Sequence, residues 1–450
     1  MVTALAVGAI IIAVTDLSVM GELRATIDRL APGGYVRLAL AILALVAGAV
    51  LFPNAERIAG RLSKAPAAWL VTLVRWGGLA LALALAVWLV RLAGFEVTVD
   101  SAWGAVSTAY GAMVEGSLGN LATITAALQS GDAAAIRLAF YPILESLVAS
   151  TPYMFAGLAV AVGFRCGLFN IGAEGQLFVG AICSVWVGFA IKGLPAIIHI
   201  PLALGAGALG GALWASIPAL LKARFGAHEV INTMMMNYIA FRLSDWLLSD
   251  KGPLKDPRTA NPISPPIELS AELPRFFADP IRFHLGFFIA LGVAGFVWWF
   301  LFKTTWGFEL RTVGQNPNAA KYAGMSITRN YLIAFALSGA LAGLAGANEV
   351  LGVNHNLANA FSSGYGFDSI ALALLGKSHP AGVVLAALLF GTLRSGGTRM
   401  QNVAEIPVDI IAVVQALVIA FIAAPAIIRA LYRIRLGGAG ETVVTRGWGK

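Results

Sequence analysis

Residues 303–331 read KTTWGFELRTVGQNPNAAKYAGMSITRNY, a polar and basic stretch between two long apolar runs of the chain. Pro317 and the small residues that follow it are typical of a short helix that begins at a proline, and Gly324 is placed to end that helix. We therefore expect a loop with a small helix inside it. Such an element suits a membrane protein that exchanges force with a soluble partner on the cytoplasmic side, although an ordinary connecting loop would show the same pattern.

The composition is that of a polytopic membrane protein. Of the 450 residues, 58% are hydrophobic and only 12% are charged, and the mean hydropathy is +0.80, whereas roughly a quarter of the residues in soluble proteins are charged. The 50 glycines suit helices that pack closely in lipid. We attribute the net charge of +8 to basic residues that flank membrane spans, because no basic cluster with interleaved aromatic residues indicates nucleic-acid binding.

The apolar segments predict an all-α, polytopic transmembrane helical bundle. A spanning helix needs about 20 mostly apolar residues, and on this basis we predict about 10 core spans plus a candidate two-helix extension in residues 1–65. We expect the first helix to be retained rather than cleaved as a signal peptide, because no basic residue precedes it. The predicted segments are residues 2–20, 37–52, 70–92, 152–168, 171–191, 197–221, 230–248, 283–302, 331–351, 367–376, 380–393 and 408–428.

Two long connections separate these segments. Residues 95–150 are mildly amphipathic, so we expect helices that lie against the membrane or cap the bundle. Residues 249–282 contain seven prolines and are expected to form an external loop. Counting crossings and basic residues places both termini and the 303–330 loop on the cytoplasmic side.

The stretch GLFNIGAEGQ, residues 167–176, is the most informative polar stretch within the apolar part of the chain. It places Asn170, Glu174 and Gln176 where two apolar segments meet. A charged group at membrane depth is costly unless it faces a cavity or a partner. Two interpretations stay open: a structural salt bridge between Arg165 and Glu174 that fixes a helix break, or a polar lining of a solute pathway.

Three further polar clusters lie in apolar segments. Glu229, Asn232 and Met236 share one helical face by their spacing, and Asn237 is nearby. The second cluster is Asn348 with Glu349, and the third is Phe367 with Asp368. For Asp368 the alternative to a pathway role is that its carboxylate caps the start of a helix.

Catalytic and cofactor sites are not indicated. Gly376, Lys377 and Ser378 resemble the end of a phosphate-binding loop, but the required earlier glycine is Ala371. The five histidines and the two cysteines show no metal-ligand spacing. We therefore expect no catalytic residue, no metal and no cofactor, and we expect any energy source to lie in another subunit.

Four motifs together resemble the permease subunit of bacterial ATP-binding cassette (ABC) importers. They are GLFNIGAEGQLFVGA (167–181), EVINTMMMNYIA (229–240), GFELRTVGQNPNAAKYAGMSI (307–327) and GYGFDSIALALLGKSHPAGVVLAALLFGTLRSGG (364–397). The nearest branch is that of the nucleoside and simple-sugar permeases, which are relatives of the ribose and branched-chain amino acid permeases. The motifs are specific for the family and much less specific for the ligand.

The resemblance implies a permease domain over residues 66–435, with residues 303–330 as its coupling loop and residues 436–450 as a cytoplasmic tail. Residues 1–65 are additional to the family pattern, either as a lineage-specific extension or through a wrongly chosen start codon. The chain would be a multi-pass protein of the bacterial inner membrane that is not itself an enzyme. It would pair with a second homologous permease, with cytoplasmic ABC ATPase subunits that hydrolyse ATP, and with an extracytoplasmic substrate-binding lipoprotein.

The same resemblance gives the site residues their expected roles. The residues expected to couple to the ATPase are Gly307, Arg311, Gly314, Asn316, Pro317, Ala319, Ala320 and Gly324. The expected substrate pathway comprises Asn170, Glu174, Gln176, Asn232, Asn237, Asn348, Glu349, Phe367 and Asp368. Their amides and carboxylates could bind ribose hydroxyls and base edges, and the aromatic ring could stack on a base, although these polar groups could also be purely structural.

The function implied is import of nucleosides, or of simple sugars, delivered by the binding lipoprotein. An ion-coupled secondary transporter of small polar solutes is the alternative, and it predicts transport without an ATPase. A membrane-embedded enzyme is a third hypothesis, but it needs a convergent catalytic set that the sequence does not show.

Overall fold

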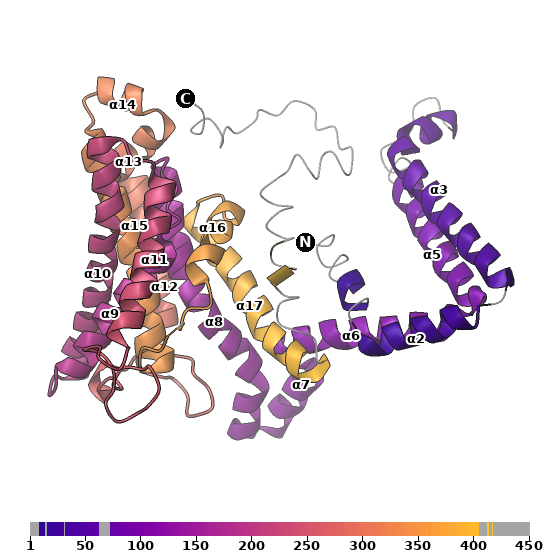
Figure 1. Cartoon of the computed structure of the whole chain (residues 1–450), viewed down its shortest axis with the longest axis horizontal. Coiled ribbons are helices and arrows are strands. Elements are labelled where there is room, and N and C mark those ends of the chain that lie inside the picture. Colours follow the sequence, from indigo (N-terminus) through magenta and orange to yellow (C-terminus); the bar gives the residue numbers. More distant parts are fainter. Residues whose placement is uncertain are drawn as a thin grey trace. The chain divides into compact units, whose positions relative to one another are not determined.

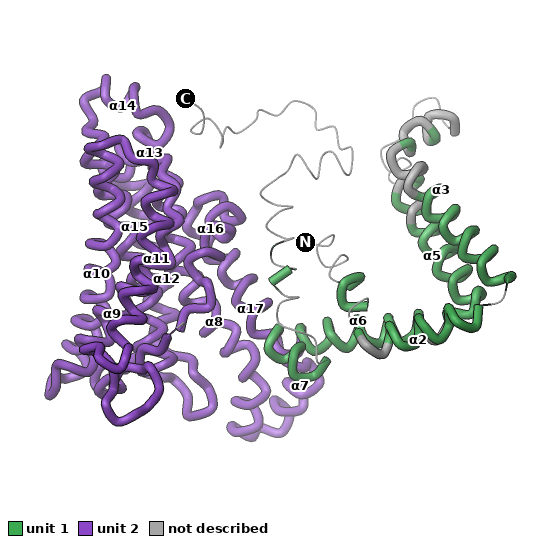
Figure 2. Tube along the Cα trace, in the orientation of Figure 1, with its two compact units in different colours: residues 1–113, 397–440 green, residues 114–396, 441–450 purple. Residues whose placement is uncertain are grey.

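A computed structural model gives the fold, and it describes residues 9–13, 16–30, 32–62, 73–359, 361–404, 412–413 and 416. The predicted span 408–428 falls almost entirely outside the described residues, and the predicted tail 436–450 falls wholly outside them. The chain forms two compact units, one of residues 1–113 and 397–440 and the other of residues 114–396 and 441–450 (Figure 2). Each unit is described by itself.

The first unit is helical throughout its described part (Figure 1). Its elements are α2 (Leu17–Asp28), α3 (Pro32–Leu62), the π-helical turn η1 (Leu73–Gly77), α5 (Gly78–Val90), the π-helical turn η2 (Arg91–Phe95) and most of α6 (Glu96–Leu118). The long helices α3 and α5 pack against each other. The predicted segment 37–52 therefore lies within α3, and the described part of the predicted segment 70–92 is helical.

The second unit contains the helices that carry the four sequence motifs (Figure 1). They are α7 (Leu121–Ser130), α8 (Ala133–Arg165), α9 (Ala173–Ala190), α10 (Ala196–Phe225), α11 (Glu229–Leu247), the 3-10 turn η3 (Leu269–Ala271), α12 (Gly286–Lys303), α13 (Thr305–Gln315), α14 (Pro317–Tyr322), α15 (Ile327–Glu349), the π-helical turn η4 (Val350–Asn354), α16 (Tyr365–Leu375) and α17 (Pro380–Ala404), which continues into the first unit.

Six of the described helices are long and apolar enough to cross a membrane: α8, α9, α10, α12, α17, and α15 together with η4. This confirms the polytopic helical bundle. One boundary was wrong, because the segment expected to begin at Pro152 begins at Ala133. Pro142 and Pro152 lie inside a continuous helix of 33 residues, so Pro152 was misleading as the start of a helix.

Glycines let three helices of the second unit approach one another closely. Gly207 and Gly211 of α10 face Gly339 and Gly343 of α15, and Gly180 of α9 also lies against Gly343. A Cβ atom at Gly211 would lie 2.9 Å from the Cα atom of Gly343, and one at Gly180 would lie 2.5 Å from its carbonyl oxygen. Small residues four apart allow this kind of backbone contact in membrane helices. The contact makes α9, α10 and α15 the most tightly joined part of the unit.

The polar stretch 303–330 is more helical than expected. The small helix predicted at Pro317 is α14, which Asn316 caps by accepting hydrogen bonds from the amides of Asn318 and Ala319. Gly324 follows the helix with a φ of +82°, a conformation that favours glycine, as expected. The preceding part, expected as loop, is the amphipathic helix α13.

The broken apolar region 367–393 forms two helices that meet at a tight turn. Helix α16 ends at Leu375, and α17 begins at Pro380. Lys377 and Ser378 in the turn both have a positive φ, of 52° and 49°, which non-glycine residues adopt only at a cost. The turn is therefore held by other contacts.

Candidate functional site

The stretch 167–176 is held by a buried network of amides. Asn170 donates to Gln176 Oε1 at 2.9 Å and to Ser338 Oγ at 2.8 Å, and Gln176 donates back to Asn170 Oδ1 at 3.1 Å. Ser338 of α15 in turn donates to the carbonyl of Ala159 in α8 at 2.6 Å. Asn170 and Gln176 are buried. Their hydrogen-bonding groups therefore join α8, α9 and α15.

Asn237 of α11 completes this network. Its side chain accepts a hydrogen bond from the amide of Gly175 at 2.8 Å and donates to the carbonyl of Ile171 at 2.9 Å. A buried amide with both ends paired to backbone fixes the position of the stretch it touches. Asn170, Gln176 and Asn237 therefore lie in one hydrogen-bonded network, and their contacts are with the protein itself.

Glu174 joins α9 to the start of α16. Its carboxylate accepts hydrogen bonds from Ser362 Oγ and from the amide of Gly366, each at 2.6 Å. The salt bridge considered with Arg165 is not formed. Arg165 donates instead to the carbonyls of Ser378, at 2.8 Å, and Lys377, at 3.3 Å. The arginine therefore holds the strained turn between α16 and α17.

A second buried polar group connects α8, α16 and α17. Tyr153 donates to Asp368 Oδ2 at 2.9 Å, and Arg394 donates to the Tyr153 hydroxyl at 2.9 Å. The Arg394 guanidinium also lies 4.9 Å from the ring centroid of Tyr365. Asp368 does not cap a helix, because α16 begins at Tyr365 and the carboxylate is used by Tyr153.

Sequence analysis missed Tyr153 and Arg394. Arg394 lies within a long apolar segment, and an ionisable residue there is the signal that could have identified it. Phe367, next to Asp368, is 45% exposed. It is the one aromatic residue among the nine predicted pathway residues, and its ring is accessible.

The remaining residues of the predicted polar clusters differ in their surroundings. Glu229 forms an ion pair with Lys222 at 2.6 Å, so this end of α11 is tied to α10. Asn348 and Glu349 are buried at the end of α15. The Asn348 side chain and the Asn232 amide nitrogen have no hydrogen-bond partner among the residues that the structure describes.

The helices of the 303–330 region are packed directly on the turn before α9. A Cβ atom at Gly314 would lie 2.7 Å from the carbonyl carbon of Cys166 and 2.8 Å from the amide nitrogen of Gly167. Only glycine fits this contact without displacing the backbone. The backbone of α13 therefore lies directly against the start of the 167–176 stretch.

A polar contact ties α13 to the start of α15. Glu309 accepts hydrogen bonds from Asn330 at 3.1 Å and from Arg329 at 2.5 Å. These two contacts hold the pKa of Glu309 below its ordinary value. The charged form is favoured, so the tie is an ionic one at neutral pH.

The predicted coupling residues fall into an inward-facing and an outward-facing group. Gly307 and Ala320 are buried, whereas Asn316, Pro317, Ala319 and Gly324 are exposed. Tyr322, which sequence analysis did not select, is 97% exposed at the end of α14. A fully exposed tyrosine beside a short helix is a suitable anchor for a protein partner.

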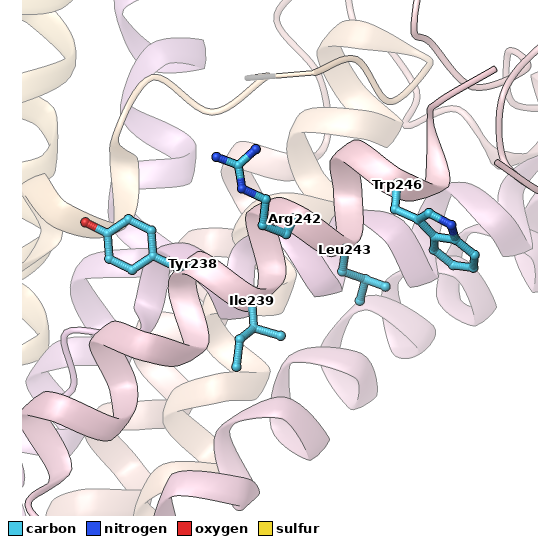
Figure 3. A pocket seen from close by; sticks show the side chains of 5 residues that line it. All are labelled: Tyr238, Ile239, Arg242, Leu243 and Trp246. Atoms are coloured by element: carbon cyan, nitrogen blue, oxygen red, sulfur yellow. The ribbon is translucent and has the colours of Figure 1, made fainter. Parts of the chain in front are cut away.

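An apolar groove lies on the outer face of α11 (Figure 3). Five residues of this one helix line it: Tyr238, Ile239, Arg242, Leu243 and Trp246. The polar residues Asn237 and Ser244 of the same helix are buried. The groove is therefore separate from the polar network. In the described ranges, no group of three or more histidine, cysteine, aspartate or glutamate side chains could hold a metal ion.

Comparisons with known proteins place these features in a family. The family described as "branched-chain amino acid transport system / permease component" matches residues 142–423, more than half of the chain. No solved structure shows a significant match.

Three relatives resemble the chain over similar lengths. A guanosine ABC transporter permease protein of Bacillus subtilis is 46% identical over 295 residues, covering 64% of this chain and 83% of that protein. A glucose ABC transporter permease protein of Haloferax volcanii is 37% identical over 63% of this chain and 76% of that protein. A nucleoside ABC transporter permease protein of Lactococcus lactis is 36% identical over 64% of this chain and 80% of that protein. The chain therefore belongs to the branched-chain amino acid transport system permease component family and is a permease subunit of an ABC importer.

Proposed function

We propose that this permease carries nucleosides into the cytoplasm, delivered by an extracytoplasmic binding lipoprotein and driven by separate ABC ATPase subunits. The observation that carries the proposal is the 46% identity to a guanosine permease. A glucose permease at 37% identity supports simple sugars as the second candidate. A second homologous permease completes the pathway.

The orientation follows from basic residues that gather at one end of the second unit. Arg165 and Arg311 both lie over the ring of Phe302, at 5.4 and 5.1 Å from its centroid. Lys222 lies 5.7 Å from the ring centroid of Tyr331, near the start of α15. Basic residues collect at cytoplasmic membrane ends. We therefore assign α13 and α14 to the cytoplasm and the loop 249–282 to the opposite side, with both termini cytoplasmic.

Helices α13 and α14 form the docking element for the ATPase in this proposal. The outward-facing residues, with Tyr322 as an anchor, would contact the ATPase, and the inward-facing glycines would transmit its movement. The contact of Gly314 with Gly167 supports this path, because it leads directly to Glu174 and α16. The force reaches the polar network through backbone contacts rather than through flexible side chains.

The nine predicted pathway residues take two roles in this proposal. Asn170, Gln176 and Asn237 form a framework, since their hydrogen bonds are used within the protein. Phe367 and Asp368 lie where a base could stack and a ribose hydroxyl could bind. The other pathway residues lie along the same route: Glu174 beside α16, Asn232 on α11, and Asn348 and Glu349 at the end of α15.

The domain assignment is part of the proposal. Residues 66–435 would form the permease domain, which includes the matched residues 142–423. Residues 1–65 would be an added N-terminal segment, and residues 436–450 a tail.

Uptake by cells that carry the complete importer tests the function. Radiolabelled guanosine, uridine, adenosine, ribose and glucose are compared with and without this gene, and again with a hydrolysis-deficient ATPase. We expect nucleoside uptake that requires both the gene and ATP hydrolysis. Uptake of sugar alone would replace nucleosides as the cargo, and uptake that survives loss of hydrolysis would refute ATP-driven import.

A further inference from the structure

Two buried side chains near the outer ends of α12 and α15 have polar atoms that no described residue satisfies. Neither ring nitrogen of His284 hydrogen-bonds to another described residue, and the same is true of both polar atoms of the Asn348 amide. Both residues are at least 99% buried. Leaving buried polar atoms unpaired is energetically unfavourable, because the atoms lose their hydrogen bonds to water without gaining new ones. A structure retains such groups when they gain partners in another state or bind water.

Glycines bring the two side chains together. The Asn348 amide and the His284 ring both lie against Gly286, at the start of α12, and the His284 ring also lies against Gly352 of η4. A side chain at either glycine would displace these polar groups. The pair therefore occupies a junction where α12 meets the end of α15.

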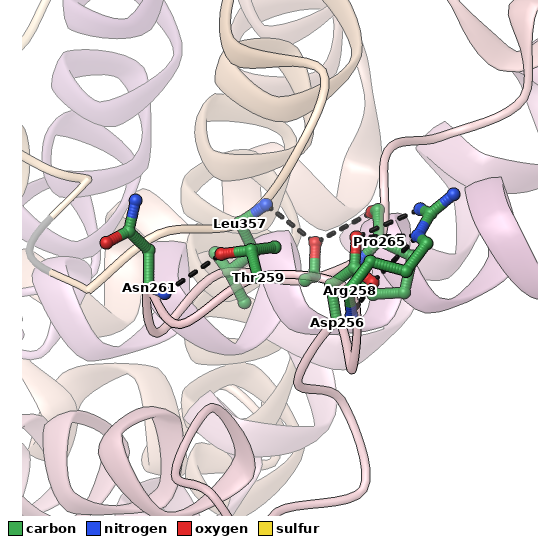
Figure 4. Close-up of polar contacts among 7 residues, drawn as sticks. Asp256, Arg258, Thr259, Asn261, Pro265 and Leu357 are labelled. Carbon is green, nitrogen blue, oxygen red and sulfur yellow. Dashed lines mark hydrogen bonds and ion pairs between the residues drawn. The ribbon is translucent and has the colours of Figure 1, made fainter.

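The external loop closes over this junction. Its backbone runs along residues 351–357 through hydrogen bonds from Leu273 to Leu351, from Ile267 to His355 and from Ser264 to Leu357, at 2.8–2.9 Å. Figure 4 shows the contact of Leu357 with the loop, together with the Asp256–Arg258 pair that braces it. The polar pair is covered from outside in this conformation.

The chemistry of the pair suits an uncharged solute. Burial lowers the pKa of His284 to about 4, and the positive charge of Arg275 adds to this effect, as do His355 and Arg282. The neutral imidazole offers one donor and one acceptor, and the Asn348 amide offers an NH2 group, which can donate twice, and a carbonyl oxygen that accepts. These donors and acceptors match the hydroxyls of a sugar or the edge of a base.

We propose that His284 and Asn348 form a solute-contact site at the outer end of the pathway, hidden here and exposed when the outer ends of α12 and α15 separate. The proposal rests on the proposed function and adds His284 to the pathway. An uncharged, hydroxyl-bearing or amide-bearing solute would supply the missing hydrogen bonds as it enters.

Uptake kinetics test the solute contact. His284→Leu should raise the KM for nucleoside uptake about tenfold with little change in Vmax. His284→Gln keeps a donor and an acceptor, so its KM should stay close to that of the wild type. The matched control is His199, another buried histidine, whose ring nitrogens already contact Ser270 Oγ at 2.8 Å and the carbonyl of Val187 at 3.2 Å. His199→Leu should lower the melting temperature without raising the KM. An unchanged KM in His284→Leu would overturn the contact.

Thiol labelling tests the opening. His284→Cys, in a chain that lacks Cys166 and Cys183, is treated from outside with a membrane-impermeant maleimide, in the nucleotide-free and the vanadate-trapped importer. We expect labelling rates that differ at least tenfold between the two states. Absent or equal labelling in both states would overturn the proposal. Asn348→Cys serves as the second probe if the first variant fails to assemble.

The two proposals fail separately. Absence of nucleoside uptake by the wild-type importer would refute the proposed cargo, whereas nucleoside uptake with an unlabelled His284→Cys importer would refute only the site at the outer end.

Discussion

Replacing Glu174 with methionine removes the carboxylate that joins α9 to the start of α16, while keeping a side chain of similar length. Two hydrogen bonds of 2.6 Å, from Ser362 and from the amide of Gly366, lose their acceptor. Each is worth about 1–2 kcal/mol, so Glu174→Met should cost about 2–4 kcal/mol of stability. At about 2–4 °C for each kcal/mol, the melting temperature should fall by roughly 4–16 °C.

Glu174→Gln is the matched control. The amide oxygen of glutamine can accept from Gly366, and its NH2 group can donate to the Ser362 hydroxyl, which is able to accept. Both hydrogen bonds are thereby kept without a charge. We expect this variant to melt within about 2 °C of the wild type, because the stability change should stay below about 1 kcal/mol.

A fluorogenic thiol dye provides the assay in detergent. Cys166 is only 1% exposed, so its reaction with the dye reports unfolding. A Glu174→Met protein that melts like the wild type would refute the structural role of the carboxylate. A Glu174→Gln protein that melts normally but has a tenfold higher KM for uptake would show instead that Glu174 contacts the solute.

Three further predictions concern other parts of the chain. Gly343→Ala places a Cβ against the carbonyl of Gly207 and should lower the melting temperature by several degrees. Gly292 has open space around its Cα, so Gly292→Ala should leave the melting temperature unchanged. Equal effects of the two substitutions would contradict the close packing. As the pH falls from 6.5 to 4, the wild type should lose up to about 3 kcal/mol of unfolding free energy relative to His284→Gln. The unfolded chain binds a proton first, because the pKa of His284 is about 4 in the folded protein and about 6.5 in the unfolded chain. Melting temperatures of the two proteins that change in parallel with pH would refute this. Tyr322→Ala should reduce uptake and stimulated ATP hydrolysis at least fivefold with an unchanged melting temperature, and normal uptake would exclude Tyr322 as an anchor.

Hydropathy and helix signals predicted much of this fold. The apolar segments beginning near Ile171, Ile197 and Tyr331 correspond to α9, α10 and α15 within a few residues. Pro317 and Gly324 correctly marked the ends of α14. The start of α8 was missed because a proline inside a long helix gives the same local signal as a helix start, and only the packing of neighbouring helices distinguishes the two cases.

The site was less predictable, since its partners are distant in sequence. A salt bridge between Glu174 and Arg165, nine positions away, was one of the two interpretations left open, but the partners of Glu174 are Ser362 and Gly366. Arg394 was overlooked because the predicted apolar segment 380–393 ends one residue before it, whereas helix α17 continues to Ala404. The unpartnered atoms of His284 follow from burial, which sequence alone does not give.

The contact between Glu174 and Gly366 also bears on which solutes the importer rejects. The start of a helix carries a partial positive charge from its unpaired amides, and inside a membrane such a terminus readily holds a phosphate or carboxylate. In α16 the chain's own carboxylate already occupies this position. On the proposed pathway, a phosphorylated solute would have to displace this side chain to reach the helix start. We therefore expect nucleotides to be excluded at this point, whereas the corresponding uncharged nucleosides do not compete for it.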